Sequence, residues 1–416
     1  MTDSIKNRVS YLVNFSIQKL IYSAHTNTLN QGVLMKVLYD TVLTATYIKR
    51  PNRFVIEVSL NGKTELAHLP NPGRMWELLF PGVPLYLVPH TAPSAKTKYR
   101  IIGIERQQTP IMLDTNYSND VADYLINTKQ IPGWEDWHVL RREYTVGHSR
   151  FDLLLSNAKK EQFLVEVKSC TLFSQRGAMF PDAITERGRK HLLHLAALQE
   201  QGYKTGLLLL VQWDKAQWFL PDYHTDLAFA QTFQNVAPKL DWKALALTWT
   251  KDFTMPNVSH LCTYPKQILN REAHNAGDYL FIMKLANDKN LSIGHKGLMH
   301  FPSGYYIYIG SAKANLDKRL DHHKRKRKNK HWHLDYLRNE CQVIAGLPIR
   351  TADDLECSLA QSVRKIADWE IKGFGCTDCH CSSHLFGMSN NPIHDKNFMQ
   401  VVEDYRMNRL DRLIGI

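Results

Sequence analysis

The sequence of 416 residues has few cysteines and no long hydrophobic run. Its seven Cys residues are an odd number and are spread unevenly, so they do not resemble the regularly spaced set of a disulfide-rich secreted domain. The longest uninterrupted apolar stretch, "GLLLLV" (206–211), is far too short to span a bilayer. The first residues also lack the compact apolar core of a signal peptide. We therefore expect a soluble protein of the reducing cytoplasm.

Acidic residues are scarce relative to basic ones. The chain has 52 Lys and Arg against 40 Asp and Glu, which gives a net charge of +12 and a pI of about 9.2. Such an excess favours a polyanionic partner. Much of the excess lies in residues 313–331, where nine Lys or Arg stand against two Asp.

The basic run "KRKRKNK" (324–330) has two interpretations. Runs of this kind are often solvated helix ends or disordered loops. This one lies between His322-His323 and the aromatic segment "HWHLDY" (331–336), which favours an edge that contacts phosphates. The nucleic-acid-binding residues predicted in the run are Lys324, Arg325, Lys326, Arg327 and Lys328.

The chain is too long for one ordinary hydrophobic core, so we expect several domains. Residues 1–40 have mixed polarity and form an N-terminal extension of unknown role. Short alternating segments with an Asn-Gly turn predict a small β-barrel over residues 41–115. Mixed helical and strand patterns predict an α/β domain over residues 116–250. A polar linker, 251–275, then leads to a third domain, 276–416.

Two apolar segments of the α/β domain carry charged residues. In "QFLVEVKSC" (162–170) the alternation places Glu166 and Lys168 on the same face of a strand. If "RFDLLLS" (150–156) pairs with it as a hairpin, Asp152 comes near Glu166. Carboxylates bind hard cations such as Mg²⁺, and a nearby Lys can help to deprotonate a metal-bound water that attacks phosphorus.

This pattern predicts a catalytic site of Asp152, Glu166 and Lys168, in which Asp152 and Glu166 bind Mg²⁺ or Mn²⁺. The alternative is a solvated strand face that carries an ordinary Glu–Lys pair. Spacing alone does not decide between the two.

Four motifs occur in the first two domains in this order: "HLPNPGRM" (68–75), "SRFDLLL" (149–155), "LVEVKSCTL" (164–172) and "FPDAITERGRKHL" (180–192). Together they resemble the sugar fermentation stimulation protein A family of bacterial DNA-binding proteins. The resemblance implies an N-terminal OB-like β-barrel followed by a PD-(D/E)xK nuclease-like α/β domain. Asp152, Glu166 and Lys168 would take the two acidic positions and the lysine position, although Phe151 stands where the motif has Pro.

The last of these motifs opens a helix that is rich in charged residues. Its edge is either a surface that faces phosphates or a solvated helix face, and we favour the first because Arg and Lys dominate it. The nucleic-acid-binding residues predicted in the motifs are Arg74, Arg187, Arg189 and Lys190.

The third domain contains the triplets "GDY" (277–279) and "YIG" (308–310), in this order. With them it resembles the GIY-YIG nuclease superfamily, whose two triplets they would represent, and the resemblance implies an α+β fold. Arg319 and His323 are four residues apart and would share one helix face. The resemblance implies that Tyr and His handle the proton of the water, that Arg neutralises the phosphorane and that a Glu holds Mg²⁺. The residues in these roles are Tyr279, Tyr308, Arg319, His323 and, as the metal ligand, Glu356.

For the same segments the alternative is an aromatic β-hairpin core with an exposed helix. The motif order favours the nuclease-like interpretation.

Near the C-terminus, "CTDCHCSSHLF" (376–386) gathers soft metal ligands. Their spacing suits a tetrahedral Zn²⁺ site, and the alternative is a tight loop of reduced thiol and imidazole groups. The predicted ligands are Cys376, Cys379, Cys381 and His384.

Together these patterns predict a DNA-binding protein that acts as a Mg²⁺-dependent DNA endonuclease. The alternative is a non-catalytic regulator of sugar-utilisation genes that uses nuclease folds as DNA clamps. The sequence has no defensible helix-turn-helix signal, which weakens sequence-specific regulation. RNA remains a possible partner because OB-like barrels accept either polymer.

Overall fold

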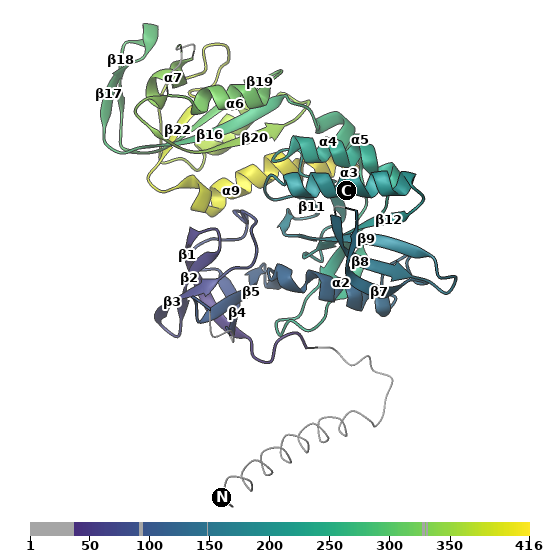
Figure 1. Ribbon diagram of the computed structural model, residues 1–416. Coiled ribbons are helices and arrows are strands. Elements are labelled where there is room, and N and C mark those ends of the chain that lie inside the picture. Colours follow the sequence, from purple (N-terminus) through teal and green to yellow (C-terminus); the bar gives the residue numbers. More distant parts are fainter. Residues whose placement is uncertain (1–36, 91–94, 148, 327–328, 330–331) are drawn as a thin grey trace, which may run out of the picture. The chain divides into compact units, whose positions relative to one another are not determined.

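Three large β-sheets follow one another along the chain in the computed structural model (Figure 1). The structure describes residues 37–90, 95–147, 149–326, 329 and 332–416. Most of the expected N-terminal extension and the basic residues Arg327 and Lys328 therefore lie outside the described residues. Among the helices of these ranges, none is long and apolar enough to cross a membrane.

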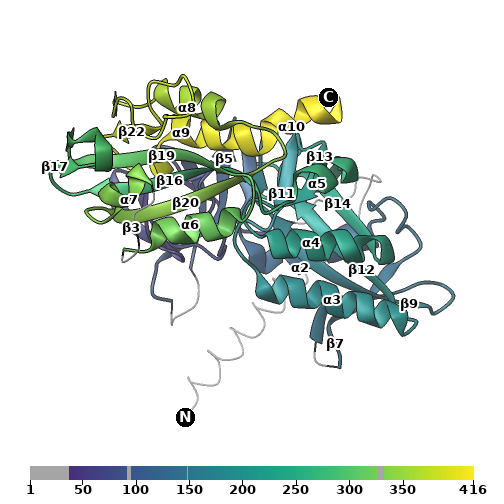
Figure 2. The ribbon, with the colours of Figure 1, turned by 90° about the horizontal axis from the view of Figure 1, so that it is seen from above.

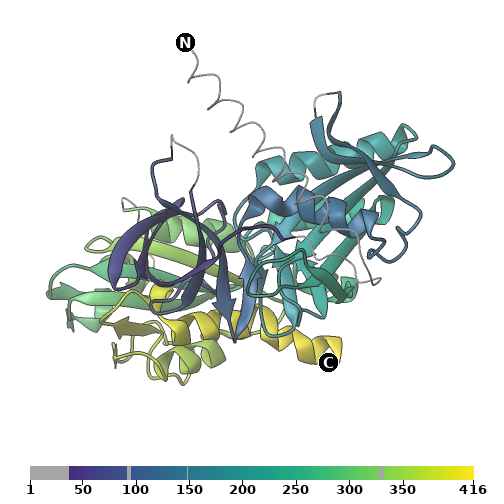
Figure 3. The same cartoon turned by 90° about the horizontal axis from the view of Figure 1, so that it is seen from below.

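The first sheet is a small barrel, seen from below in Figure 3. Its order is β3-β2-β1-β4-β5-β6, and a parallel contact between β3 and β5 closes it. Asn61 and Gly62 have positive φ angles of 51° and 76° in the β2–β3 turn, which confirms the predicted hairpin. The strands are β1 (Leu43–Asn52), β2 (Val55–Leu60), β3 (Lys63–His68), β4 (Pro84–Pro89), β5 (Tyr99–Arg106) and β6 (Thr109–Met112).

The second sheet has the order β15-β14-β12-β9-β8-β7. The hairpin β8–β9 is antiparallel, whereas β9, β12 and β14 run parallel. The strands are β7 (His138–Val146), β8 (Ser149–Ser156), β9 (Gln162–Cys170), β12 (Lys204–Val211), β14 (Asp241–Thr248) and β15 (Asn257–Leu261).

Helices cover both faces of this sheet. Leu208 and Leu210 of β12 pack with α2 (Ser118–Asn127) on one face. Leu207 and Leu209 point the other way and pack with α3 (Glu186–Glu200) and α4 (Leu227–Val236). Figure 2 shows α3 and α4 lying side by side along the sheet. The continuous apolar run of β12 is therefore that of a strand buried on both faces.

The segment expected to be a polar linker contains regular structure. Strand β15 extends the second sheet, and α5 (Lys266–Glu272) follows it. A small sheet beside them consists of β10 (Leu172–Phe173), β11 (Gly177–Phe180) and β13 (Trp218–Pro221).

The third sheet is antiparallel and has the order β20-β16-β19-β22-β21. A separate hairpin, β17–β18, lies between the two predicted triplets along the chain. The strands are β16 (Gly277–Leu285), β17 (Lys289–Ser292), β18 (Leu298–Phe301), β19 (Gly304–Ala312), β20 (Gln342–Arg350), β21 (Trp369–Glu370) and β22 (Leu385–Met388).

Helices cover this sheet on both faces as well. Helices α6 (Leu316–Lys324) and α7 (His333–Arg338) pack against the face that carries Tyr279 and Tyr308. Helices α8 (Glu356–Arg364) and α9 (Lys396–Glu403) pack against the opposite face.

The C-terminal segment ties the third sheet to the earlier parts of the chain. In α10 (Arg409–Ile414), Leu410 is buried in a cluster that includes Trp218. The Trp218 Nε1 group donates a hydrogen bond of 2.8 Å to Asp411. Upstream, Glu403 accepts a hydrogen bond of 3.0 Å from Arg106 at the end of β5.

We expect Leu410→Ala to lower the free energy of unfolding by about 2–5 kcal/mol, because it leaves a cavity at a fully buried position. The matched control is Leu413→Ala in the same helix, where the side chain is 42% exposed and the expected change is within about 0.5 kcal/mol. Urea unfolding of the two variants measures both values. Equal effects would show that α10 does not pack as described.

Candidate functional site

The first candidate site lies on the β8–β9 hairpin. Leu153 pairs with Val165 and Leu154 with Leu164, so the predicted hairpin is confirmed and Asp152 lies level with Glu166. Asp152 is held by two hydrogen bonds, from the Val167 backbone N–H (2.8 Å) and from Asn119 Nδ2 (3.1 Å). Strand pairing and α2 together fix the orientation of this carboxylate.

The Glu166 carboxylate is buried, with 2% of the residue exposed. Its Oε1 atom contacts Lys168 Nζ and lies 2.5 Å from His191 Nδ1 on α3. Burial on its own would raise the pKa of Glu166, but the hydrogen bond from His191 and the charge of Lys168 outweigh it and hold the pKa below its ordinary value. The Oε2 atom has no hydrogen-bond partner among the described residues.

Burial, and then the negative charge of Glu166, raise the pKa of Asp152 above its ordinary value. Asp152 and Glu166 line a cavity of about 540 Å³ together with Lys168 and His191. Two carboxylates that repel each other, one with an unpartnered oxygen, are the kind of ligand set that a hard divalent cation satisfies. Asp152 and Glu166 are therefore the residues that could hold such an ion.

Basic residues of α3 border this cavity. Arg187, Lys190, His191 and His194 recur at helical spacing and line an adjoining hollow of about 660 Å³. Arg187 and Lys190 are exposed, whereas Arg189 is half-buried. The structure thus places Arg187 and Lys190 where an anionic ligand of the cavity could reach them.

Arg74 has a different environment from the basic residues of α3. Its guanidinium donates hydrogen bonds of 2.7 Å to the Asp182 carbonyl and to Thr225 Oγ1, and it stacks on Trp76 at 4.6 Å. Asp182 and Thr225 follow β11 and β13, so these contacts hold the segment that carries Arg74 against the loops after the small sheet. A phosphate contact by Arg74 remains a prediction.

The second candidate site lies on β16 and β19. Tyr279 pairs in register with Gly310, and its hydroxyl lies 2.8 Å from His323 Nε2. The Tyr308 ring lies 6.2 Å from the Tyr279 ring and 6.0 Å from the His323 ring. A Cβ atom at Gly310 would overlap the Tyr279 hydroxyl, so only glycine leaves room for this arrangement.

The tyrosines of this site are neutral at physiological pH. Burial raises the pKa of both Tyr279 and Tyr308, and the nearby charge of Arg319 offsets only part of the rise. The Arg319 guanidinium stacks on Trp332 at 4.2 Å. The Tyr279 hydroxyl therefore keeps its proton, and it lies within hydrogen-bonding distance of His323 Nε2.

Glu356 begins α8 and completes the set of five predicted residues. Its Oε2 atom accepts a hydrogen bond of 2.5 Å from Ser311 Oγ, and its Oε1 atom lies 3.0 Å from His384 Nδ1. Burial alone would raise the pKa of Glu356, but these two hydrogen bonds outweigh it and lower the pKa. Each oxygen keeps a second lone pair that a cation could use.

The basic run begins where α6 ends. Lys324, Arg325 and Lys326 are exposed, and Lys324 also forms an ion pair of 3.0 Å with Asp321. Arg319 and His323 lie on the same helix and reach the second site. The described part of the run is therefore next to this site along the chain.

The predicted zinc ligands require one correction. A cluster of four ligand atoms forms in the described chain, but Cys357 of α8 belongs to it and Cys376 does not. Cys357 lies far from the loop in sequence and reaches it only because α8 packs beside β19. No local spacing signal could have found it. Asn119 and His191, which contact Asp152 and Glu166 and are also missing from the sequence analysis, likewise come from separate helices.

Known protein families match three parts of the chain. Residues 48–113 match the SfsA N-terminal OB domain, and residues 116–252 match the sugar fermentation stimulation protein RE domain. The OB-like barrel is therefore confirmed. Residues 278–407 match a domain of unknown function, DUF123, so the GIY-YIG resemblance remains a prediction.

Both a solved structure and several known sequences are similar to this chain. The structure of Pyrococcus furiosus SfsA in complex with Ca²⁺ covers 55% of this chain and 99% of its own, at 25% identity and a TM-score of 0.50. The sugar fermentation stimulation protein homolog of Methanosphaera stadtmanae is 40% identical over 203 residues, which are 48% of this chain and 84% of the relative. The Clostridium novyi homolog is 39% identical over 192 residues, 46% of this chain and 84% of the relative. Because these relatives align along most of their own length, the chain belongs to the sugar fermentation stimulation protein family.

Proposed function

We propose that this chain binds DNA and cleaves its phosphodiester backbone with a divalent metal ion held by Asp152 and Glu166. The observation that carries the proposal is the buried Oε2 atom of Glu166, which lies beside Asp152 and has no hydrogen-bond partner in the described part of the chain. A buried carboxylate oxygen without a donor costs free energy that a bound cation would recover. Mg²⁺ or Mn²⁺ is the cation we propose.

A relative supports the choice of metal. The solved Pyrococcus furiosus protein is described as a complex with Ca²⁺. Ca²⁺ and Mg²⁺ are both hard cations that bind carboxylate oxygen, although Mg²⁺ requires shorter distances and a stricter geometry. We propose that this chain likewise binds a hard divalent cation, Mg²⁺ or Mn²⁺, through Asp152 and Glu166.

The roles of the side chains follow from their contacts. When bound, the metal would supply a water of lowered pKa as nucleophile. Lys168 lies beside Glu166 and is placed to hold that water or to stabilise charge on the phosphate. His191 orients Glu166 from α3, while Arg187 and Lys190 at the cavity edge would bind neighbouring phosphates.

DNA is the substrate we propose because the chain is strongly basic and its basic residues border the cavity. We further propose three functional domains: the barrel over 41–115, the PD-(D/E)xK nuclease-like domain over 116–250 and the GIY-YIG-like domain over 276–416. In the last, Tyr279, His323 and Arg319 would act on a second scissile phosphate. Tyr308 and Glu356 are proposed for the same centre, with Glu356 as its Mg²⁺ ligand.

One observation favours a second function, that of a non-catalytic DNA clamp. Both oxygens of Glu356 already accept hydrogen bonds. The negative charge of Glu166 is likewise already balanced by the ammonium group of Lys168. Carboxylates balanced in this way can be stable without metal. A single assay separates the two functions, namely incubation of the full chain with plasmid, single-stranded and branched DNA in Mg²⁺, Mn²⁺ or EDTA. Nicking that EDTA abolishes supports the enzyme, and binding without nicking supports the clamp.

We expect Asp152→Asn to lower metal-dependent cleavage by the first site on the order of a hundredfold. The new Asn side chain still accepts the Val167 N–H, and Asn119 can turn its amide so that its oxygen accepts from the new NH2 group; the change also removes a partly buried charge that repels Glu166, so stability should be unchanged or slightly higher. Single-turnover cleavage and urea unfolding measure the two effects. If the variant unfolds, Asp152 is a structural partner and the catalytic role is wrong.

Gly310→Ala should lower cleavage by the second site by on the order of tenfold or more, because the added methyl group displaces the Tyr279 hydroxyl from His323. The matched control is Gly346→Ala on β20, where the added atom meets the flexible end of Leu320 at 3.2 Å and makes ordinary van der Waals contact with the Phe281 ring at 3.6 Å. Both changes are made in full-length protein that also carries Asp152→Asn, so that the first site is silent. Equal rates for the two variants would remove Tyr279 and His323 from the mechanism.

Replacing Lys324, Arg325 and Lys326 by Gln should flatten the salt dependence of DNA binding. Each lost phosphate contact removes about 0.9 from the slope of log affinity against log salt concentration, so three contacts remove roughly 2.7. The control replaces Lys159 and Lys160, which are exposed at the turn of the β8–β9 hairpin. An unchanged slope in the first variant would identify the run as a solvated loop.

A further inference from the structure

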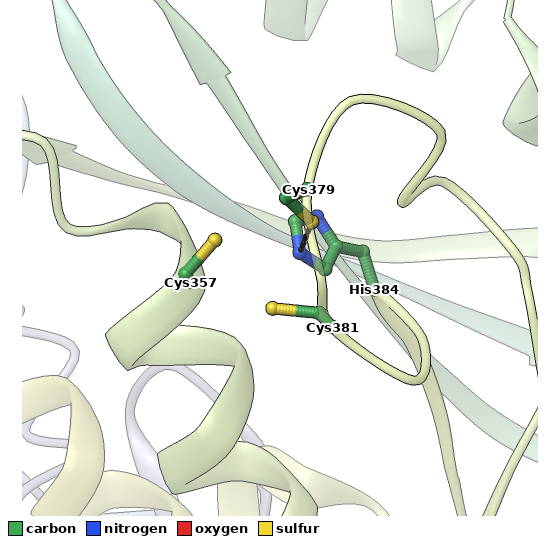
Figure 4. Close-up of side chains that lie close together, drawn as sticks. All are labelled: Cys357, Cys379, Cys381 and His384. Atoms are coloured by element: carbon green, nitrogen blue, oxygen red, sulfur yellow. Dashed lines mark hydrogen bonds between the residues drawn. The ribbon is translucent and has the colours of Figure 1, made fainter.

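Four soft metal ligands converge between α8 and the loop that precedes β22 (Figure 4). Cys379, Cys381 and His384 come from the loop, and Cys357 points toward them from the first turn of α8. We propose that these four residues bind one Zn²⁺ ion as a closed, structural site that also positions Glu356.

The distances suit a tetrahedral ion. The four ligand atoms all lie within 4.8 Å of one another, and His384 Nε2 lies 3.5 Å from Cys379 Sγ. Zinc–sulfur bonds of about 2.3 Å and zinc–nitrogen bonds of about 2.0 Å make the edges of the tetrahedron roughly 3.5–3.8 Å long. Small side-chain movements therefore bring all four atoms into place.

The histidine is already oriented for this role. His384 is buried, and its Nδ1 atom lies 3.0 Å from the Glu356 carboxylate, which fixes the proton on that nitrogen. The lone pair is then on Nε2, the atom that faces Cys379. A carboxylate behind a ligating imidazole is the usual partner of a zinc-bound histidine.

The type of ligand selects the metal. Three thiols and one imidazole are soft or borderline donors, which favour Zn²⁺ over the hard Mg²⁺ proposed for the carboxylate sites. Four protein ligands also leave no open position for a water or a substrate. The site is therefore structural and distinct from the two candidate catalytic centres.

Glu356 connects this site to the candidate centre on β16 and β19. Zinc would fix α8 through Cys357 and the start of β22 through His384, on either side of the Glu356 carboxylate. The backbone of His384 also pairs with Ile309, next to Tyr308, and the loop at Gly375 packs on the Tyr308 ring. The inference that the metal holds Glu356 for catalysis rests on the proposed function; the zinc site itself does not.

The first experiment measures the zinc content of the full-length protein, purified under reducing conditions, by elemental analysis. We expect about one Zn²⁺ per chain, at least a tenfold loss in Cys357→Ser, and no loss in Cys376→Ser. Cys376 is the matched control because it lies in the same loop but outside the cluster. Loss in the Cys376 variant with retention in the Cys357 variant would overturn the ligand set.

A second measurement covers the case in which Cys357→Ser does not fold. The wild-type protein is stripped of metal, reduced and titrated with Co²⁺, and tetrahedral thiolate coordination should give intense visible absorption that added Zn²⁺ abolishes. Absence of both zinc and this spectrum would overturn the proposal.

The positioning of Glu356 is tested by zinc affinity and not by DNA cleavage. Glu356→Ala should weaken Zn²⁺ binding by about 10–100-fold, because the ligating imidazole loses its carboxylate partner. Ser311→Ala removes the other partner of Glu356 and should leave the affinity nearly unchanged. Equal zinc affinities for the wild type and the Glu356 variant would show that Glu356 does not support the zinc ligand His384, whatever the result of the nuclease assays.

Discussion

Burial of strand β12 on both faces is the constraint on which the central fold depends. Leu207 and Leu209 require one apolar layer and Leu208 and Leu210 require another, so α2 must cover one face and α3 with α4 the other. Charged side chains have little room in such a sandwich. Three of them, Asp152, Glu166 and Lys168, gather at the end of the β8–β9 pairing that lies away from its turn, where they meet the basic edge of α3.

The two candidate centres stabilise the negative charge of a buried carboxylate in related ways. Each places a partly or fully buried carboxylate against a histidine, Glu166 against His191 and Glu356 against His384. Both carboxylates consequently have lowered pKa values in spite of burial. The difference lies in the oxygen atoms, since Glu166 keeps one without a partner among the described residues whereas both oxygens of Glu356 are engaged.

Local signals in the sequence were sufficient for the features that depend on local spacing. Alternation in β9 places Glu166 and Lys168 together, the Asn-Gly pair sets the β2–β3 turn, and the four-residue spacing directs Arg319 and His323 to one side of α6. What spacing could not supply is contact between distant segments. Cys357, the engagement of Arg74 by Asp182, and the incorporation of β15 into the second sheet all depend on tertiary packing.

The contact between Trp218 and Asp411 has a consequence for synthesis of the chain. Trp218 is completely buried, but part of its covering comes from Met407 and Leu410. A ribosome would release these residues only after the long stretch of chain that separates them from β13 had been translated. Until then the small sheet β10-β11-β13 carries an incompletely covered aromatic side chain, Trp218, which favours chaperone binding during translation.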